Sequence, residues 1–331
     1  MLPLLAVIMG IPAAAVPAAA ATTMTCGTVV TRSATLANDV GPCEEDGLII
    51  AASGITLDLG GHRVLGTYDP HPATPPDEEG ITFRNVRRSA VRNGEVTHFS
   101  TGVIISKGSQ NTVSQLNVHD NIGRSAAGDG IAVYASDSNR IANNRVVHNG
   151  PASGITLLGE GSVGSRDNEI ADNLVLDNNL PELNDEGRPD WKRDVGIAVE
   201  GPGATHNRIL RNTVEGSGLH GINVFPACST GYDITTGCPG TVPNEYNVIR
   251  GNNVNRNGFG EPLASAPIGD GMILAKGPRP VVMPGHNTVE GNRANNNMRN
   301  GITLGGGNGQ ELTDDLDDGG RELRVLPAAG G

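Results

Sequence analysis

A short asparagine-containing motif recurs along this chain and constrains its fold more than any other feature. In residues 139–179 the motif occurs twice, with two asparagines five positions apart and an apolar residue two positions after each. The first asparagine column of the repeat is Asn111, Asn139, Asn168, Asn207, Asn247 and Asn287. The second column is Leu116, Asn144, Asn173, Asn212, Asn252 and Asn292. A motif that repeats at a near-fixed spacing predicts a solenoid.

Between the motifs, glycine-led segments such as Gly154-Ile155-Thr156-Leu157 alternate apolar and other residues. This period of two, rich in β-branched residues, predicts short strands, and stacked strands of this kind form a parallel β-helix with one continuous core. Asparagine tolerates left-handed turns, and amides stacked about 4.8 Å apart form hydrogen-bonded ladders. We therefore interpret the asparagine columns as structural rather than as a binding site.

The pattern N-x-I-x-x-N-x-V, followed by N-x-x-x-x-G-I-x-L, resembles the right-handed parallel β-helix repeat of the pectate-lyase-like superfamily. The resemblance covers roughly residues 45–305, and the opening coil from Gly47 resembles secreted β-helix proteins of actinobacterial type. It implies an all-β fold, a single-stranded right-handed parallel β-helix of about eight or nine coils. The superfamily contains polysaccharide lyases, glycoside hydrolases, alginate epimerases and non-catalytic proteins, so the resemblance leaves the reaction open.

The termini suggest a secreted protein with four segments. Residues 1–21 resemble a signal peptide, with an apolar run from Leu4 to Met9 and small residues from Ala18 to Ala21, although no basic residue precedes Arg32. A membrane anchor is the alternative, but prolines and glycine interrupt the run. We expect an N-terminal cap over residues 22–46, the β-helix over 47–305 and a Gly/Asp-rich C-terminal tail over 306–331.

Four cysteines fit an extracellular location. Local pairing, Cys26 with Cys43 and Cys228 with Cys238, is our choice among three connectivities, and the first bridge would staple the cap. The net charge of −12 disfavours nucleic acid as a partner. We expect a monomer that binds polysaccharide and has no membrane attachment after signal cleavage.

A further column consists of the residue before each strand glycine. Its members are Glu79, Thr101, Asp129, Ser153, Val195, His220, Asp270 and Asn300. Coils stacked in register would place His220 beside Asp270, about 4.8 Å apart. Insertions at 179–193, 226–246, 259–269 and 276–285 surround these coils and predict a groove over residues 190–285.

Candidate roles follow from the chemistry of each side chain. The candidate catalytic residues are His220, Asp270, Lys192 and Arg193. The candidate substrate-binding residues are Tyr134, Glu200, Phe225 and Lys276. Asp129 and Asp194 are candidate ligands of Ca²⁺, the one cofactor considered. A lyase needs a base and a cation that neutralises the substrate carboxylate, whereas a hydrolase would use Asp and His.

The resemblance does not extend to complete catalytic motifs. Leu219-His220-Gly221 and Gly128-Asp129-Gly130 match pectin-type hydrolases only in part, and Asp69-Pro70-His71 lacks the final Asp of the alginate-epimerase motif. Each candidate has the alternative of being a turn residue, and we interpret His119, His148 and His206 as surface residues without partners. Two hypotheses result: a polysaccharide lyase or glycoside hydrolase, or a non-catalytic β-helix binding scaffold at the cell surface or in the periplasm.

Overall fold

The structure is a computed structural model of the chain. It describes residues 21–67, 78–123, 128–159, 163–178, 195–225, 244–258, 269–274 and 285–304, and the backbone alone of 182–183, 189–190 and 311–313. Strands, turns and bends make up these residues, which contain no helix long and apolar enough to cross a membrane.

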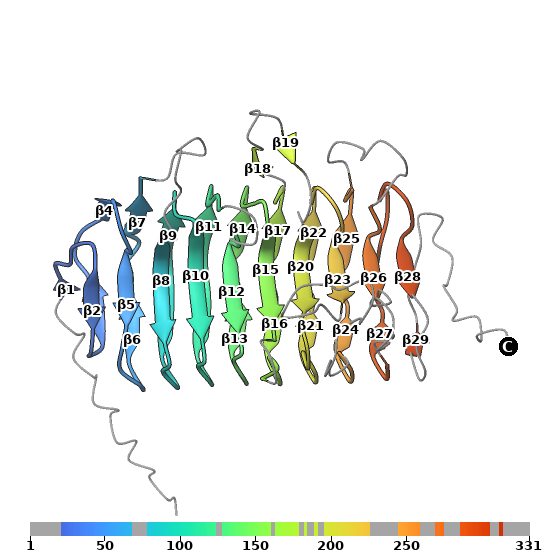
Figure 1. Ribbon diagram of the computed structural model, residues 1–331, viewed down its shortest axis with the longest axis horizontal. Helices are drawn as coiled ribbons and strands as arrows, with labels where there is room; N and C mark the ends of the chain where they lie inside the picture. The colour runs from blue at the N-terminus through green and yellow to red at the C-terminus, as the bar shows by residue number, and fades with distance from the viewer. Residues whose placement is uncertain are drawn as a thin grey trace, which may run out of the picture.

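One face of the molecule is a ten-stranded parallel sheet. Its strands, in order, are β2 (Thr28–Val30), β5 (Leu48–Ile50), β8 (Glu79–Arg84), β10 (Thr101–Ser106), β12 (Ile131–Tyr134), β15 (Ser153–Leu158), β20 (Val195–Glu200), β23 (Ile222–Phe225), β26 (Met272–Leu274) and β28 (Ile302–Leu304). Each of these strands comes from a different coil, and the coils lie side by side along the molecule (Figure 1).

The second sheet contains two parallel columns of short strands, because each coil bends once between them. The first column is β1 (Ala21–Thr22), β3 (Ala34–Leu36), β6 (Thr56–Asp58), the first halves of β9 (Ala90–Thr97) and β11 (Thr112–His119), β13 (Arg140–Ala142), β16 (Glu169–Ala171), β21 (Arg208–Leu210), β24 (Val248–Arg250), β27 (Thr288–Glu290) and β29 (Glu311–Thr313). The second column is β4 (Val40–Cys43), β7 (Arg63–Gly66), the second halves of β9 and β11, β14 (Arg145–Val147), β17 (Leu174–Leu176), β22 (Thr213–Glu215) and β25 (Asn253–Asn255). A separate antiparallel pair joins β18 (Glu182–Leu183) and β19 (Pro189–Asp190). The predicted right-handed parallel β-helix is confirmed.

The repeat sets the register of the coils. Ile141 pairs with Ile170, and Ile170 with Ile209, so equivalent apolar residues stack in the core and are fully buried. The asparagines stack beside them as predicted: the side-chain amide of Asn139 donates to Asn168 Oδ1 at 3.0 Å, and that of Asn144 donates to Asn173 Oδ1 at 3.0 Å. The asparagine columns are therefore structural ladders.

The physical reason for the turns differs from the one expected. The residues in the left-handed region come just before the ladder asparagines, as at Ser138 (φ 58°), Asn143 (φ 58°) and His148 (φ 54°). The expectation that the ladder asparagines themselves adopt this geometry is wrong. Their conformation leaves the amides free to hydrogen-bond along the column, and the preceding residue makes the bend.

The N-terminal segment expected as a cap joins both sheets. Its strand β2 pairs with β5 and its strand β3 pairs with β6. The predicted disulfide between Cys26 and Cys43 is present, with the sulfurs 2.06 Å apart. Cys228 and Cys238 lie outside the described residues.

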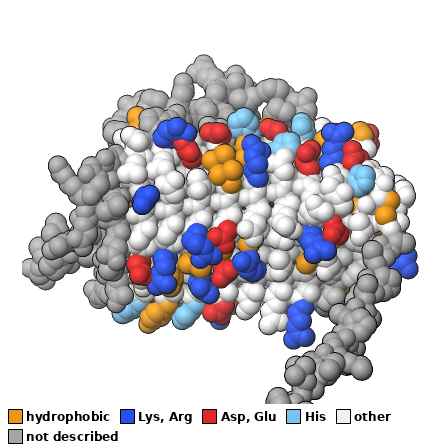
Figure 2. Space-filling view, turned by 180° about the vertical axis from the view of Figure 1, so that it is seen from behind, with side chains coloured by type: hydrophobic (Ala, Val, Ile, Leu, Met, Phe, Trp, Pro, Cys, Tyr) orange, Lys and Arg blue, Asp and Glu red, His pale blue; other side chains and the backbone are white. Residues whose placement is uncertain are grey.

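Seen from behind, the molecule shows acidic and basic side chains close to one another along the coils (Figure 2). Glu169 lies between two arginines, 3.1 Å from Arg140 Nε and 3.3 Å from an Arg208 terminal nitrogen. Asp172 likewise pairs with Arg211, which is 2.8 Å away. Because positive and negative side chains are interleaved on this face, these arginines are neutralised by neighbouring coils rather than gathered into a basic groove.

Candidate functional site

The predicted column of residues before the strand glycines is in register at the start of the ten-stranded sheet. Ile222 pairs with Met272, which places His220 and Asp270, two residues earlier on each chain segment, on neighbouring coils. The backbone N–H of Asp270 donates to His220 Nδ1 at 3.2 Å, and the nearer carboxylate oxygen, Oδ2, lies 4.0 Å from the same nitrogen. The predicted proximity of His220 and Asp270 is confirmed.

Two residues that the sequence analysis gave no role complete this cluster. Asp270 Oδ1 accepts hydrogen bonds from Arg299 Nε at 3.1 Å and from Asn300 Nδ2 at 2.8 Å. Asn300 also donates to Thr303 Oγ1 at 3.1 Å. The Asp270 side chain is fully buried, and its Oδ2 has no hydrogen-bond partner in the described part of the chain. A buried carboxylate oxygen without a donor marks a place for a ligand group or a bound water.

The protonation of His220 follows from its surroundings. Burial lowers the pKa of His220, the Asp270 carboxylate opposes this effect, and the Arg299 guanidinium adds to it. Because Nδ1 accepts the Asp270 backbone N–H, the neutral ring carries its hydrogen on Nε2. His220 therefore presents a hydrogen-bond donor at Nε2, rather than a base.

Asp129 belongs to the same column several coils earlier, and both of its carboxylate oxygens accept hydrogen bonds. Its Oδ1 accepts from the Ser153 backbone N–H at 3.1 Å and from Thr156 Oγ1 at 2.6 Å, and its Oδ2 accepts from the Tyr134 hydroxyl at 2.8 Å. Burial raises the pKa of Asp129 to about 6 and, with the nearby carboxylate, raises the pKa of Tyr134. Ca²⁺ takes six to eight oxygen ligands, so an Asp129 carboxylate surrounded by hydrogen-bond donors does not fit this ion.

The remaining candidates divide into those that the structure places and those outside the described residues. Tyr134, Leu158, Glu200 and Phe225 form one row across four neighbouring strands, since each pairs with the next. Asn223, two residues before Phe225 on β23, places its Nδ2 3.4 Å from Glu200 Oε1. Three predicted substrate-binding side chains thus share a row. Lys192, Arg193, Asp194 and Lys276 lie outside the described residues.

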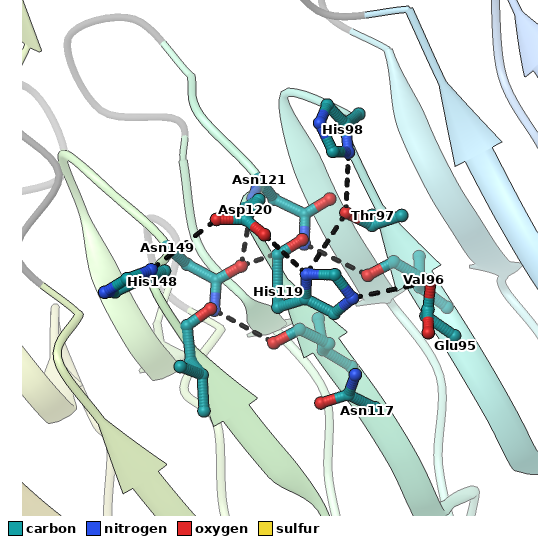
Figure 3. A network of polar contacts seen from close by, with 12 residues as sticks. Glu95, Val96, Thr97, His98, Asn117, His119, Asp120, Asn121, His148 and Asn149 are labelled. Atoms are coloured by element: carbon teal, nitrogen blue, oxygen red, sulfur yellow. Dashed lines mark hydrogen bonds and ion pairs between the residues drawn. The ribbon is translucent and has the colours of Figure 1, made fainter.

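A second polar cluster lies at the turns that follow β9, β11 and β14 (Figure 3). His119 Nδ1 is 2.6 Å from Asp120 Oδ2, and His119 Nε2 is 3.5 Å from Glu95 Oε1. His148 Nδ1 is 3.7 Å from the other Asp120 oxygen. The interpretation of His119 and His148 as residues without partners is wrong, because the coils stack in register and bring Asp120 within reach of both imidazoles.

His206 also has partners. Its ring stacks on Tyr246 with centroids 5.0 Å apart, and Tyr246 stacks on His286 at 5.2 Å. The three residues occupy the same turn position in successive coils, each two residues before a first-column strand. A column of turn residues, compared coil by coil as was done for the asparagines, would have revealed both groups from the sequence.

Comparisons with known proteins agree with the fold. The family described as periplasmic copper-binding protein (NosD) matches residues 74–195. The Dettilon tailspike protein is 18% identical with a TM-score of 0.60, over 89% of this chain and 54% of the tailspike. The periplasmic alginate epimerase AlgG, as a mutant, is 15% identical with a TM-score of 0.53, over 87% of this chain and 61% of the epimerase.

A mutant tailspike of E. coli bacteriophage HK620, solved with a pentasaccharide, is 12% identical with a TM-score of 0.51, over 81% of this chain and 46% of the tailspike. No curated protein matches the chain. The chain therefore spans about half of each tailspike's length. At these identities the solved structures show the fold alone, and they agree that the protein is a parallel β-helix.

Proposed function

We propose that this protein binds a polysaccharide outside the cytoplasm, along the strand starts of the ten-stranded sheet. The observation that carries the proposal is the His220–Asp270 cluster, where a buried carboxylate oxygen has no partner beside a fixed imidazole donor. Sugar hydroxyls both donate and accept hydrogen bonds, which suits such a pair. The Cys26–Cys43 disulfide favours an oxidising compartment.

Two features of the fold support the choice of a long ligand. The residues before the strand glycines lie in register on successive coils, with Val195 between Ser153 and His220, so a chain molecule that lies along the coils can pass several of these positions. A tailspike of similar fold was solved with a pentasaccharide, and an alginate epimerase shares the fold as well. These proteins act on or bind saccharides by name, and the proposal extends saccharide binding to this chain.

Cleavage of the polysaccharide is the second candidate function. Asp270 Oδ2 lies 4.0 Å from His220 Nδ1, so a small movement of the ring would let the carboxylate stabilise an imidazolium formed during a reaction. Against this, Nδ1 already accepts a backbone N–H, which leaves Nε2 protonated and unable to act as a base. The resting geometry supports binding better than proton transfer.

Copper binding does not fit the described residues. The NosD family is described as copper-binding, and the segment that matches it contains His98, His119 and His148. However, His119 faces Asp120 and Glu95, and the described residues contain no group of three or more His, Cys, Asp or Glu side chains that could hold a metal. We therefore derive no copper chemistry from this cluster.

The test is a panel of soluble polysaccharides, neutral and uronate-containing, added to the purified protein with and without Ca²⁺. Binding is measured by isothermal titration calorimetry, and cleavage by new reducing ends and by the ultraviolet absorbance of unsaturated products. We expect binding, and a loss of affinity of about tenfold in the His220→Ala variant, which lacks one hydrogen-bond donor.

His206→Ala is the matched control, because it removes an imidazole from a turn away from the strand starts of the ten-stranded sheet. New ends with absorbance would establish a lyase, and new ends without it a hydrolase. Binding without products would support the non-catalytic scaffold. Absence of both binding and products across the panel would refute the proposed function.

A further inference from the structure

In the His220–Asp270 cluster the hydrogen-bond donors lie nearer the protein surface than the carboxylate acceptor does. The Arg299 side chain is 39% exposed and that of His220 is 12% exposed, whereas the Asp270 side chain is fully buried. Arg299 uses Nε for Asp270, and its two terminal nitrogens have no acceptor among the described residues. A ligand that approaches this part of the molecule therefore meets N–H donors first and the carboxylate beneath them.

The cluster has no net charge. The Asp270 carboxylate forms an ion pair with the Arg299 guanidinium at 3.1 Å, and burial lowers the pKa of His220, which favours its neutral form. An arginine whose charge is cancelled by a buried partner attracts an anion far less than a free one does. The protein as a whole carries a net charge of −12, which adds long-range repulsion of polyanions.

The unpartnered Asp270 Oδ2 further restricts the ligand. A hydroxyl group can accept from an N–H donor and at the same time donate its own hydrogen to Oδ2. A ligand carboxylate has only acceptor atoms, so its approach to Oδ2 would place two negative oxygens together without a hydrogen between them. Of the groups that a sugar carries, a hydroxyl is the one that satisfies the whole cluster.

We propose that His220, Asp270, Arg299 and Asn300 form a charge-neutral subsite that takes an uncharged sugar residue of the bound polysaccharide. Arg299 and His220 donate to its hydroxyl oxygens. Asp270, held by Arg299 and Asn300 through Oδ1, accepts a sugar hydroxyl at Oδ2 and cancels the arginine charge. This inference rests on the proposed function, which it narrows from polysaccharides in general to neutral ones.

The experiment compares two variants that change the charge of the subsite in opposite directions. Titrations use arabinoxylan, galactomannan and β-glucan as neutral probes, and polygalacturonate and alginate as acidic probes, each at low and high NaCl. The wild-type protein should bind a neutral probe with an affinity that NaCl does not change, since no charge is neutralised on binding. It should bind the acidic probes at least about tenfold more weakly.

Asp270→Asn leaves the Arg299 charge without its partner. We expect this variant to bind the neutral probe about tenfold more weakly, because one acceptor is lost, and polygalacturonate about tenfold more tightly at low salt. Arg299→Gln should also lower the affinity for the neutral probe, and it should not raise the affinity for polygalacturonate. Since Arg299 is partly exposed, this variant remains informative even where Asp270→Asn fails to fold.

Asp172→Asn is the matched control. Asp172 pairs with Arg211 through two bonds of 2.8 Å on the other sheet, so this variant also releases an arginine and changes the net charge by one unit. It should leave both affinities unchanged. A wild-type protein that prefers polygalacturonate, or variants that bind like the wild type, would overturn the neutral subsite while saccharide binding stands. A wild-type protein that binds no probe would refute both.

Discussion

Asp129 links the chemistry of one side chain to the stability of the solenoid. It is buried among the hydroxyls of Tyr134 and Thr156 and a backbone N–H, and burial raises its pKa from the ordinary value of 3.8 to about 6. The folded protein thus holds this proton more tightly than the unfolded chain does. The stabilisation from proton binding is complete below about pH 4 and is lost as the pH rises through about 6.

Asp129→Asn should remove this pH dependence, because the amide has a similar shape and does not ionise. A pKa difference of about two units corresponds to about 3 kcal/mol. From pH 4 to pH 7, the free energy of unfolding of the variant should therefore rise by up to that amount relative to that of the wild type. The measurement is the free energy of unfolding by urea at both pH values. Equal pH dependence in the two proteins would show that Asp129 ionises normally.

Tyr134→Phe provides an internal check on the same carboxyl group. The Tyr134 hydroxyl donates to Asp129 Oδ2 and lowers the pKa of Asp129 against the effect of burial. Without this donor, the loss of stability should move to higher pH.

The sequence predicted which residues of the candidate site lie together when those residues occupy the same repeated column. His220 and Asp270 occupy the same position in successive coils, so the register alone places them together. Arg299 comes one residue before that column, and its contact with Asp270 depends on side-chain direction, which periodicity does not encode. For the same reason the sequence did not indicate that Asp270 would be buried and left with one unpartnered oxygen.

At the scale of the strand and its turn, the asparagine ladders hold neighbouring coils together. Asn173 Oδ1 accepts from both the backbone and the side-chain N–H of Asn144, each at 3.0 Å. Its own amide donates to Ile141 O at 2.9 Å and to Asn212 Oδ1 at 3.0 Å. One side chain therefore satisfies buried groups on the coils before and after it, which explains why the sequence repeats asparagine here.

Asn173→Ala should be among the costly substitutions in this protein. It leaves two buried Asn144 donors without an acceptor, and each such group costs about 1–3 kcal/mol, so we expect a loss of about 3–5 kcal/mol. Urea denaturation followed by circular dichroism measures the change. Asn253→Ala, in an exposed position on β25, is the control and should cost less than about 0.5 kcal/mol. Similar losses at both positions would contradict the ladder as a source of stability.

At the scale of the whole molecule, each coil contacts mainly the coils before and after it. The ten-stranded sheet follows chain order from β2 to β28, so an interaction at one end has no direct contact with the middle. Stability in such an array is close to a sum of coil and interface contributions. This architecture was predictable from the period of the sequence, and it determines how far a local change can spread.

The Cys26–Cys43 disulfide tests this locality. It closes a loop with a sequence separation of 17 residues beside the first paired strands, and a loop of this size contributes about 3 kcal/mol. In the double variant Cys26→Ala/Cys43→Ala, amide hydrogen exchange should accelerate in β2 and β5 and stay unchanged in β15 and β20. Reduction of the wild type with dithiothreitol, which keeps both cysteine side chains, should give the same pattern. Uniform acceleration along the solenoid would mean that its coils unfold as one cooperative unit, and that substitutions at the candidate site would destabilise distant coils as well.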